Sequence, residues 1–149
     1  MAYGYNNKNT FTPTARQNWI CIGDGKESAF FLNQFGEGGA PEGAVRASDN
    51  YMTAIQENIV MNAEAGFLHD AELNRFVKAA TADEGFPEFP AEFTETQQAQ
   101  ATSKGRRVKA GKISTEKLES EIAFHTENQN AELKAIHEYL LAAAKTWGA

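Results

Sequence analysis

No proline or glycine interrupts the chain between Ile113 and Trp147, and no other stretch of the sequence is as long without them. These two residues disfavour helix interiors most strongly, so their absence favours a helix here. Ser114 has the hydroxyl with which a helix start accepts a free backbone N–H. Gly148 stands where the left-handed residue that ends many helices is expected. The sequence therefore predicts one long C-terminal helix.

Apolar side chains recur along this predicted helix. From Leu133 onward they alternate in steps of three and four residues, the spacing of a coiled-coil-like seam. His125 and Gln129 interrupt the same face with polar side chains. A straight helix of this length would extend about 50 Å, which exceeds the width of a compact domain of this size. The helix must therefore project, break between His125 and Gln129, or be covered by a second chain.

The apolar seam has two interpretations. It can pack on the core of its own chain, as the apolar face of most helices does. It can also pair with a second copy of the chain, because sustained three-four spacing suits helix pairing. The second interpretation predicts an oligomer interface made of Leu118, Ile122, Leu133, Ile136, Leu140 and Trp147.

Length and cysteine content bound the class of protein. The 149 residues are enough for one ordinary domain with a sizeable core. Cys21 is the only cysteine, which excludes an intramolecular disulfide and a cysteine-based zinc cluster. Its neighbours Trp19, Ile20 and Ile22 are apolar, so we expect a buried structural thiol and not a nucleophile.

Charge and hydropathy indicate a soluble protein. The net charge of −6 argues against nucleic-acid or membrane-surface binding by the molecule as a whole. No apolar run approaches the roughly 20 residues that span a bilayer, and residues 1–8 contain no apolar core of a signal peptide. We therefore expect an intracellular, cytoplasmic protein without a membrane partner.

The predicted organisation is a flexible N-terminal arm followed by one domain. The arm covers residues 1–16, and a single α-rich domain covers residues 17–149, with an irregular linker at about 85–112. The arm is polar, and such terminal segments are disordered unless something ties them down. Its aromatic side chains leave open that it binds a neighbouring subunit.

The first part of the domain carries hairpin signals. Residues 18–22 and 28–35 are β-prone and flank an Asp-Gly pair, which predicts a β-hairpin. Residues 28–35 could also form a helical turn, because periodicity cannot decide at this length. The glycine-rich stretch 36–43 lacks the spacing of a phosphate-binding loop, so we interpret it as a connector.

Helical patterns dominate the rest of the chain. Apolar periodicity predicts a helix from about residue 45 or 48 to 65 and a second one at about 70–83, with Asp70 as its N-cap. The predicted fold is therefore mainly α, of the α+β class. It has a helical core, a long C-terminal helix and a small N-terminal β-hairpin.

The segment from Phe86 to Phe93 contains two Phe-Pro pairs among acidic residues. Its prolines exclude a helix and favour an extended backbone. The phenylalanines can cover the predicted helix pair, because large exposed apolar patches are uncommon. The segment can also dock into a partner's groove, as linear motifs do. This second interpretation nominates the partner-binding residues Phe86, Glu88, Phe89, Glu92 and Phe93.

Five positive charges and two glycines fall within residues 104–112, which predicts a flexible basic loop. The stretch from Glu57 to Glu95 is acidic, so the chain is charge-polarised. Five charges without an interleaved aromatic residue make only a modest nucleic-acid footprint. The candidate residues for contact with nucleic acid or an acidic partner are Lys104, Arg106, Arg107, Lys109 and Lys112.

The three histidines are the candidates for metal chemistry. His69-Asp70 has the form of a hydrolase metal dyad, which needs further histidine and aspartate ligands. His125 and His137 are twelve residues apart on one predicted helix, too far for the i, i+4 spacing of two helical ligands. The sequence therefore predicts no metal site and no cofactor, and no motif assigns a catalytic residue.

Three functional hypotheses follow. The first is a non-enzymatic interaction or assembly protein that forms a homo-oligomer through its C-terminal helix and N-terminal arm. It is based on the seamed helix, the aromatic arm and the opposed charge blocks. An alternative is an acidic inhibitor that covers a basic, nucleic-acid-binding surface of a target complex. A second alternative is nucleic-acid binding through residues 104–112.

Overall fold

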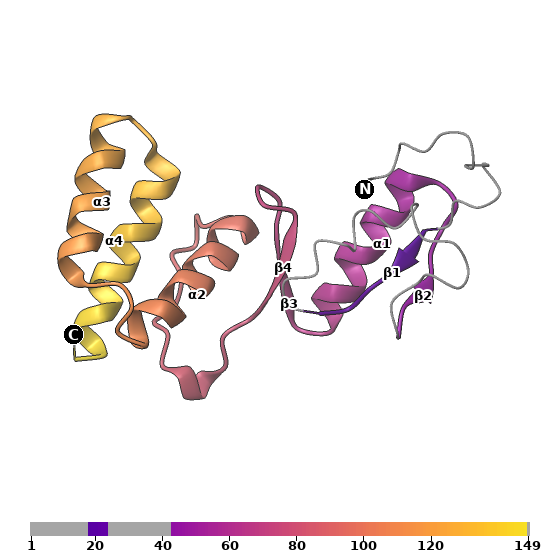
Figure 1. Ribbon diagram of the computed structural model, residues 1–149, viewed down its shortest axis with the longest axis horizontal. Helices are drawn as coiled ribbons and strands as arrows, with labels where there is room; N and C mark the ends of the chain where they lie inside the picture. Colours follow the sequence, from indigo (N-terminus) through magenta and orange to yellow (C-terminus); the bar gives the residue numbers. More distant parts are fainter. Residues whose placement is uncertain (1–17, 24–42, 149) are drawn as a thin grey trace. The chain divides into compact units, whose positions relative to one another are not determined.

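The computed structural model describes residues 18–23 and 43–148. In chain order these residues form β1 (Trp19–Ile20), β2 (Val45–Arg46), α1 (Tyr51–Glu64), β3 (Phe67–Asp70), β4 (Arg75–Lys78), the 3₁₀ helix η5 (Ala82–Glu84), α2 (Glu95–Lys109), α3 (Thr115–Glu127) and α4 (Ala131–Thr146). The predicted class is confirmed, because the fold is mainly helical with a C-terminal helix and a small sheet near the N-terminus (Figure 1). No helix among these described residues is long and apolar enough to cross a membrane.

Contacts within the chain divide it into two compact units. The N-terminal unit comprises residues 1–69 and 73–76, and the helical unit comprises residues 70–72 and 77–149. The division runs through the hairpin of β3 and β4. Each unit has a buried apolar cluster of its own, which explains two units where the sequence predicts a single domain.

A small antiparallel sheet begins the N-terminal unit. Strand β1 pairs with β2, with Trp19 opposite Arg46. The predicted partner strand, residues 28–35, lies outside the described residues, as do the predicted N-terminal arm and most of the glycine-rich connector. Cys21 is buried in a cluster with Phe76, as predicted for a structural thiol.

Helix α1 confirms the first predicted helix, and it buries asparagines. Asn58 Oδ1 accepts from the Cys21 N–H at 3.1 Å, while Asn58 Nδ2 donates to the Trp19 carbonyl at 3.0 Å. Asn62 repeats this one turn later, accepting from the Gly23 N–H at 3.1 Å and donating to the Cys21 carbonyl at 3.1 Å. The two side-chain amides therefore bind the backbone after β1 much as a neighbouring strand would.

The predicted helix at about 70–83 is wrong, because the first part of that range belongs to a second two-stranded sheet, in which β3 and β4 pair on either side of a turn. Asn74 in the turn has a φ of 49°, in the left-handed region that asparagine tolerates better than most residues. Asp70, the predicted helix cap, instead accepts from the Glu72 N–H at 3.1 Å within the turn. A short apolar run around Phe76 fits either element, so its spacing could not decide.

The predicted C-terminal helix over residues 113–147 is two helices, α3 and α4. Gln129 has a φ of 58°, which ends the first helix, and the Asn130 side chain caps the second by accepting from the Leu133 N–H at 3.1 Å. Ser114 caps α3, as predicted. The break therefore occurs at the polar interruption, which is one of the three outcomes that the sequence left open.

The predicted irregular linker at about 85–112 is wrong for its second half, which forms α2. A capping box starts this helix: Thr94 Oγ1 accepts from the Gln97 N–H at 3.1 Å, and Gln97 Oε1 accepts from the Thr94 N–H at 2.9 Å. Gly105, which suggested a loop, lies inside α2 against the ring of Phe86. The glycine makes room for an aromatic ring and not for a turn.

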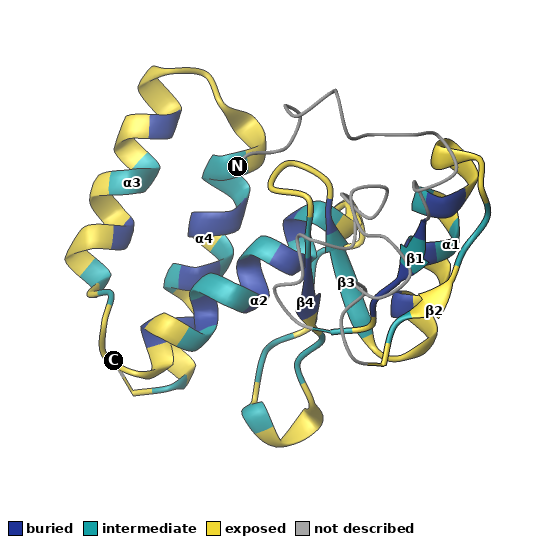
Figure 2. Cartoon of the chain, turned by 45° about the vertical axis from the view of Figure 1, so that its right-hand side comes forward, coloured by how far each residue is buried: buried dark blue, intermediate teal, exposed yellow. Residues whose placement is uncertain are grey.

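The core of the helical unit forms among its three helices and the segment before α2. Figure 2 shows the buried residues of α2 and α4 in dark blue. The Tyr139 hydroxyl donates to the Pro87 carbonyl at 2.5 Å, and burial raises the pKa of Tyr139 to about 12, which keeps it a donor. The buried apolar members of this core are Phe93, Ala101, Val108, Leu118, Ile136, Leu140 and Ala144.

Candidate functional site: a histidine and carboxylate cluster

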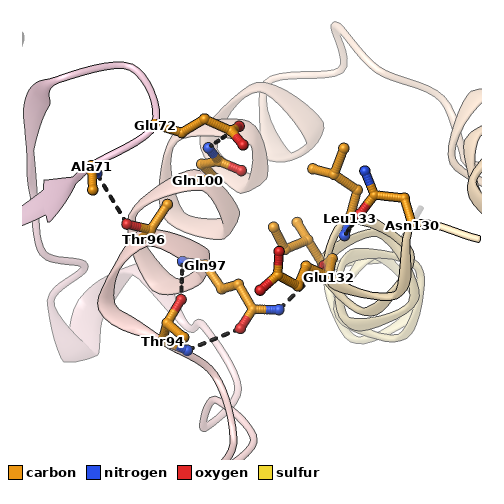
Figure 3. Close-up of a pocket in the computed structure, with 10 residues that line it drawn as sticks. Ala71, Glu72, Thr94, Thr96, Gln97, Gln100, Asn130, Glu132 and Leu133 are labelled. Carbon is orange, nitrogen blue, oxygen red and sulfur yellow. Dashed lines mark hydrogen bonds between the residues drawn. The ribbon is translucent and has the colours of Figure 1, made fainter.

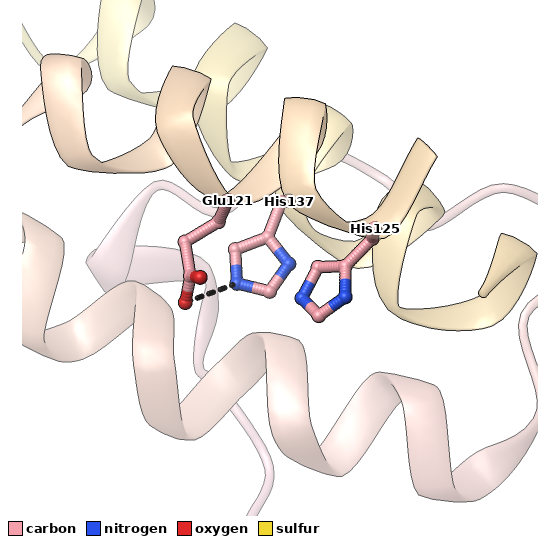
Figure 4. Close-up of side chains that lie close together, drawn as sticks. All are labelled: Glu121, His125 and His137. Atoms are coloured by element: carbon pink, nitrogen blue, oxygen red, sulfur yellow. Dashed lines mark ion pairs between the residues drawn. The ribbon is translucent and has the colours of Figure 1, made fainter. Parts of the chain in front are cut away.

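The break at Gln129 places His125 of α3 beside His137 of α4, with ring centroids 5.1 Å apart. Glu121 lies one helical turn before His125, so both side chains share one face of α3. One ligand atom from each of Glu121, His125 and His137 lies within 4.8 Å of the other two (Figure 4). The twelve-residue spacing therefore gives no ground for excluding a metal site, because that argument rests on one straight helix and the structure has two.

The hydrogen bonds of His137 determine which ring nitrogen carries its proton. Nδ1 lies 2.7 Å from the Leu133 carbonyl oxygen, which can only accept, so Nδ1 must donate. Nε2 of the neutral ring then keeps its lone pair and accepts from Lys104 Nζ at 2.6 Å. Metal-binding histidines are commonly oriented in this way, with the second ring nitrogen donating to a carbonyl or carboxylate.

Burial and charge set the protonation of the cluster. Burial is the main reason that the pKa of His137 lies below its usual value, and the nearby charge of Lys104 lowers it further. Burial alone would raise the pKa of Glu121, but the nearby charges of Lys104, His137 and Lys117 and the hydrogen bond from Lys104 together outweigh burial and lower it. A neutral imidazole and a carboxylate therefore face each other near neutral pH, which are the forms that bind a metal ion.

His125 completes the cluster from inside α3. Its side chain is buried, and its ring meets Phe124 edge-on at a centroid distance of 5.3 Å. Its ring nitrogens are not among the fully buried side-chain atoms that lack a hydrogen-bond partner in the described residues, so water or a ligand can reach them.

The residues of the cluster fit a transition-metal ion by chemistry and nearly by distance. Two imidazole nitrogens and one carboxylate oxygen are a common protein donor set for Zn²⁺, with a fourth position left open. Bonds of about 2.0–2.1 Å in tetrahedral geometry put the donors roughly 3.4 Å apart. His137 Nε2 and Glu121 Oε1 are 3.8 Å apart (dashed in Figure 4), and all three ligand atoms lie within 4.8 Å of one another, so binding an ion requires the pairs to approach by up to about 1.4 Å.

The helical unit also has a polar pocket of about 440 Å³ (Figure 3). Gln97 Nε2 donates to the Glu132 carbonyl at 3.2 Å, and Gln100 Nε2 donates to Glu72 Oε1 at 3.2 Å. These polar groups bind one another across the pocket wall. Because these polar groups already have hydrogen-bond partners, the histidine cluster is the stronger candidate for a binding site.

The predicted oligomer interface is largely part of the chain's own core. Leu118, Ile136 and Leu140 are buried there. Leu133 and Trp147 pack against the same cluster, and Ile122 is half-buried on α3. Their burial agrees with the first interpretation of the seam, in which it packs on the core of its own chain, and an oligomer interface at these residues stays a prediction.

The predicted partner-binding segment covers the helical unit with its aromatic side chains. Phe93 is buried in the core, and Phe89 packs against it. Phe86 meets Trp147 edge-on at 5.1 Å. The interpretation as a covering segment is confirmed, although it covers α2 and α4 and not the pair of helices that the sequence suggested. Glu88 and Glu92 are exposed.

Three of the five predicted basic contact residues bind partners within the helical unit. Lys104 binds His137 and Glu121, as described above. The Arg106 guanidinium bonds both carboxylate oxygens of Glu84, at 2.8 and 3.1 Å, and this bond is the main reason that the pKa of Glu84 falls to about 2. Lys109 donates to the Glu84 carbonyl and lies over the Trp147 ring. The other two, Arg107 and Lys112, are exposed.

Two local signals could have revealed the histidine cluster in the sequence. Glu121 and His125 have the i, i+4 spacing of helical ligands, and Asn128-Gln129-Asn130 combines residues that favour helix ends and starts. Together they imply a helical hairpin that brings His137 back beside His125.

Comparisons of the chain with protein-family models, curated proteins and solved structures found no match.

Proposed function

We propose that the helical unit binds a divalent transition-metal ion, and that zinc fits its donors best. The observation that carries this proposal is the convergence of Glu121, His125 and His137, whose ligand atoms lie within 4.8 Å of one another. The donors come from two helices joined by a short turn, so a bound ion would link α3 to α4. Such a bond would add the free energy of metal binding to the stability of the fold.

The surroundings of the cluster favour a binding role over catalysis. The donor set leaves one coordination position that a water could fill, as catalytic zinc sites do. Lys104 Nζ lies 2.6 Å from His137 Nε2 and 3.5 Å from Glu121 Oε1, so a positive charge of the protein fills the space through which a catalytic site would admit its substrate. We therefore propose a structural or metal-sensing role and keep the non-enzymatic assignment as part of the proposal.

Calorimetric titration with zinc chloride tests the proposal. We expect the wild-type protein to bind one zinc ion, and His125→Asn and His137→Asn each to weaken the affinity at least about tenfold. His69→Asn is the matched control, because this third histidine lies in the N-terminal unit. Circular dichroism of each variant checks that it is folded. Equal zinc affinity in all four proteins, or none in the wild type, would refute the site.

A separate observation favours self-association as a second candidate function, with another copy of the chain as the partner. Helix α1 buries its asparagines and exposes Met52 and Val60, whose exposed fractions are 70% and 52%. Exposed apolar side chains on one helix can pair across a two-fold axis, where the same surface meets itself. This proposal keeps the homo-oligomer hypothesis but transfers the contact from the C-terminal seam to α1.

Light scattering at low and high salt tests self-association. We expect a mass above the 16.3 kDa of one chain at both salt concentrations, since apolar contacts survive salt. The double variant Met52→Glu and Val60→Glu should return to a single chain. Ser120→Glu together with Ala123→Glu, which adds the same two negative charges at exposed positions of α3, should not. A wild-type monomer at high protein concentration under both conditions would exclude this second function.

A further inference from the structure

The cation position of the histidine cluster is already taken by Lys104. Its ammonium nitrogen lies 2.6 Å from His137 Nε2 and 3.5 Å from Glu121 Oε1. These are two of the three atoms that would bind a metal ion. The Lys104 ammonium group therefore already places a positive charge next to these donor atoms.

Lys104 and a metal ion exclude each other. The Nε2 lone pair of His137 can accept a hydrogen bond from the ammonium or form a metal bond, but not both. A metal ion about 2.0–2.1 Å from Nε2 would lie within van der Waals contact of the ammonium, and two like charges at that separation repel strongly. Binding of the ion therefore requires Lys104 to leave.

Lys104 can leave by moving its side chain alone. The charged side chain is 22% exposed, so its end has a short path to water. Neighbouring residues on α2 hold the helix in place without it, since Ala101, Gly105 and Val108 are buried against the core. A lysine stem has four rotatable bonds and loses little when its ammonium returns to water.

We infer that Lys104 is a resident cation that a zinc ion displaces, and that it thereby sets the metal affinity of the cluster. This inference rests on the proposed function. In the metal-free state Lys104 neutralises Glu121 and keeps His137 oriented, so the ligands are pre-arranged. In the metal-bound state the Lys104 amine is released to solvent. Part of the free energy of zinc binding is spent on this displacement.

Zinc titrations of three proteins test the inference: the wild type, Lys104→Met and Lys112→Met. Methionine keeps most of the length of the side chain and removes its charge. We expect Lys104→Met to bind zinc about tenfold more tightly than the wild type. Lys112 is exposed and has no part in the cluster, so its variant should match the wild type within about twofold.

Amine acylation at fixed pH gives a second readout, followed by mass spectrometry of the wild-type protein. Saturating zinc should increase the acylation of Lys104, because its amine is then free, and should leave that of Lys112 unchanged. Unchanged Lys104 acylation together with unchanged affinity of Lys104→Met would overturn the inference. Weaker zinc binding by Lys104→Met would overturn it too, since it would make the lysine amine a metal ligand.

The outcomes separate the inference from the function on which it rests. If zinc binding requires His125 and His137 but has the same affinity in Lys104→Met as in the wild type, the inference is overturned and the proposed function stands. Absence of zinc binding in both the wild type and Lys104→Met would defeat both. Binding by Lys104→Met where the wild type shows none would defeat the proposed function of the wild-type protein, and it would support the inference that Lys104 occupies the donors.

Discussion

Replacing Asn58 and Asn62 together with alanine is expected to unfold the N-terminal unit and leave the helical unit folded. The double variant removes four hydrogen bonds to the backbone of residues 19–23. Two N–H groups and two carbonyls would lose their partners, and each buried unsatisfied group costs about 1–3 kcal/mol. The total, about 4–6 kcal/mol after partial access of water, is comparable to the whole stability of a small unit.

Hydrogen exchange followed by mass spectrometry measures this result for each unit separately. We expect peptides from α1 to lose their protection, while peptides from α2, α3 and α4 keep theirs. Gln56→Ala is the matched control, because it removes an exposed amide from the same helix. The single variant Asn58→Asp keeps the side-chain oxygen that accepts from the Cys21 N–H, but it loses the amide group that donates to the Trp19 carbonyl. It should therefore also destabilise the unit. Protection of α1 equal to that of the control would contradict the role of the asparagines.

Gly105→Ala is expected to destabilise the helical unit by about 2 kcal/mol. In an exposed helix interior the same change would stabilise by up to about 1 kcal/mol, because alanine is the better helix former. At this position the new Cβ would lie 2.6 and 2.9 Å from ring carbons of Phe86 and 3.3 Å from Leu140 Cδ2. The contact distances therefore predict a reversed sign, which urea unfolding of the helical unit can measure.

A double variant assigns this effect to the aromatic ring. Phe86→Leu shortens the side chain that the new Cβ would meet, so Gly105→Ala in that background should cost less than half as much. The difference is a coupling energy between the two positions, of the size expected for residues in contact. Equal costs in both backgrounds would show that the ring moves aside freely and that the glycine is not needed for packing.

The fold class and several helix ends could be predicted because their signals are local. The predicted N-cap Ser114 and the predicted left-handed Gly148, which follows α4, both behave as expected. The hairpin of β3 and β4 could not be predicted, because the apolar spacing around Phe76 and Val77 also fits a helix. Asn74, whose left-handed φ makes the turn, has no strong partner signal such as a following glycine.

A single straight helix over residues 113–147 does not predict the histidine cluster. Twelve residues along a straight helix separate two side chains by about 18 Å. The turn at Gln129 brings the rings of His125 and His137 to 5.1 Å. The sequence also left open what two groups of candidate residues contact. The apolar seam predicts which face of α4 is buried but not what packs against that face. The sequence places Lys104 in a basic loop, whereas in the structure it makes a partly buried contact with His137.

Titration of the wild-type protein with cobalt(II), followed by visible absorption, tests the central claim most directly. Cobalt(II) is a spectroscopic substitute for zinc. When it is four-coordinate, with nitrogen and oxygen ligands, it absorbs visible light far more strongly than the aqueous ion. We predict that absorption rises to saturation at one equivalent, that it disappears in His125→Asn and His137→Asn, and that it persists in His69→Asn. A spectrum that stays that of aqueous cobalt(II) at excess protein would contradict a metal site at Glu121, His125 and His137.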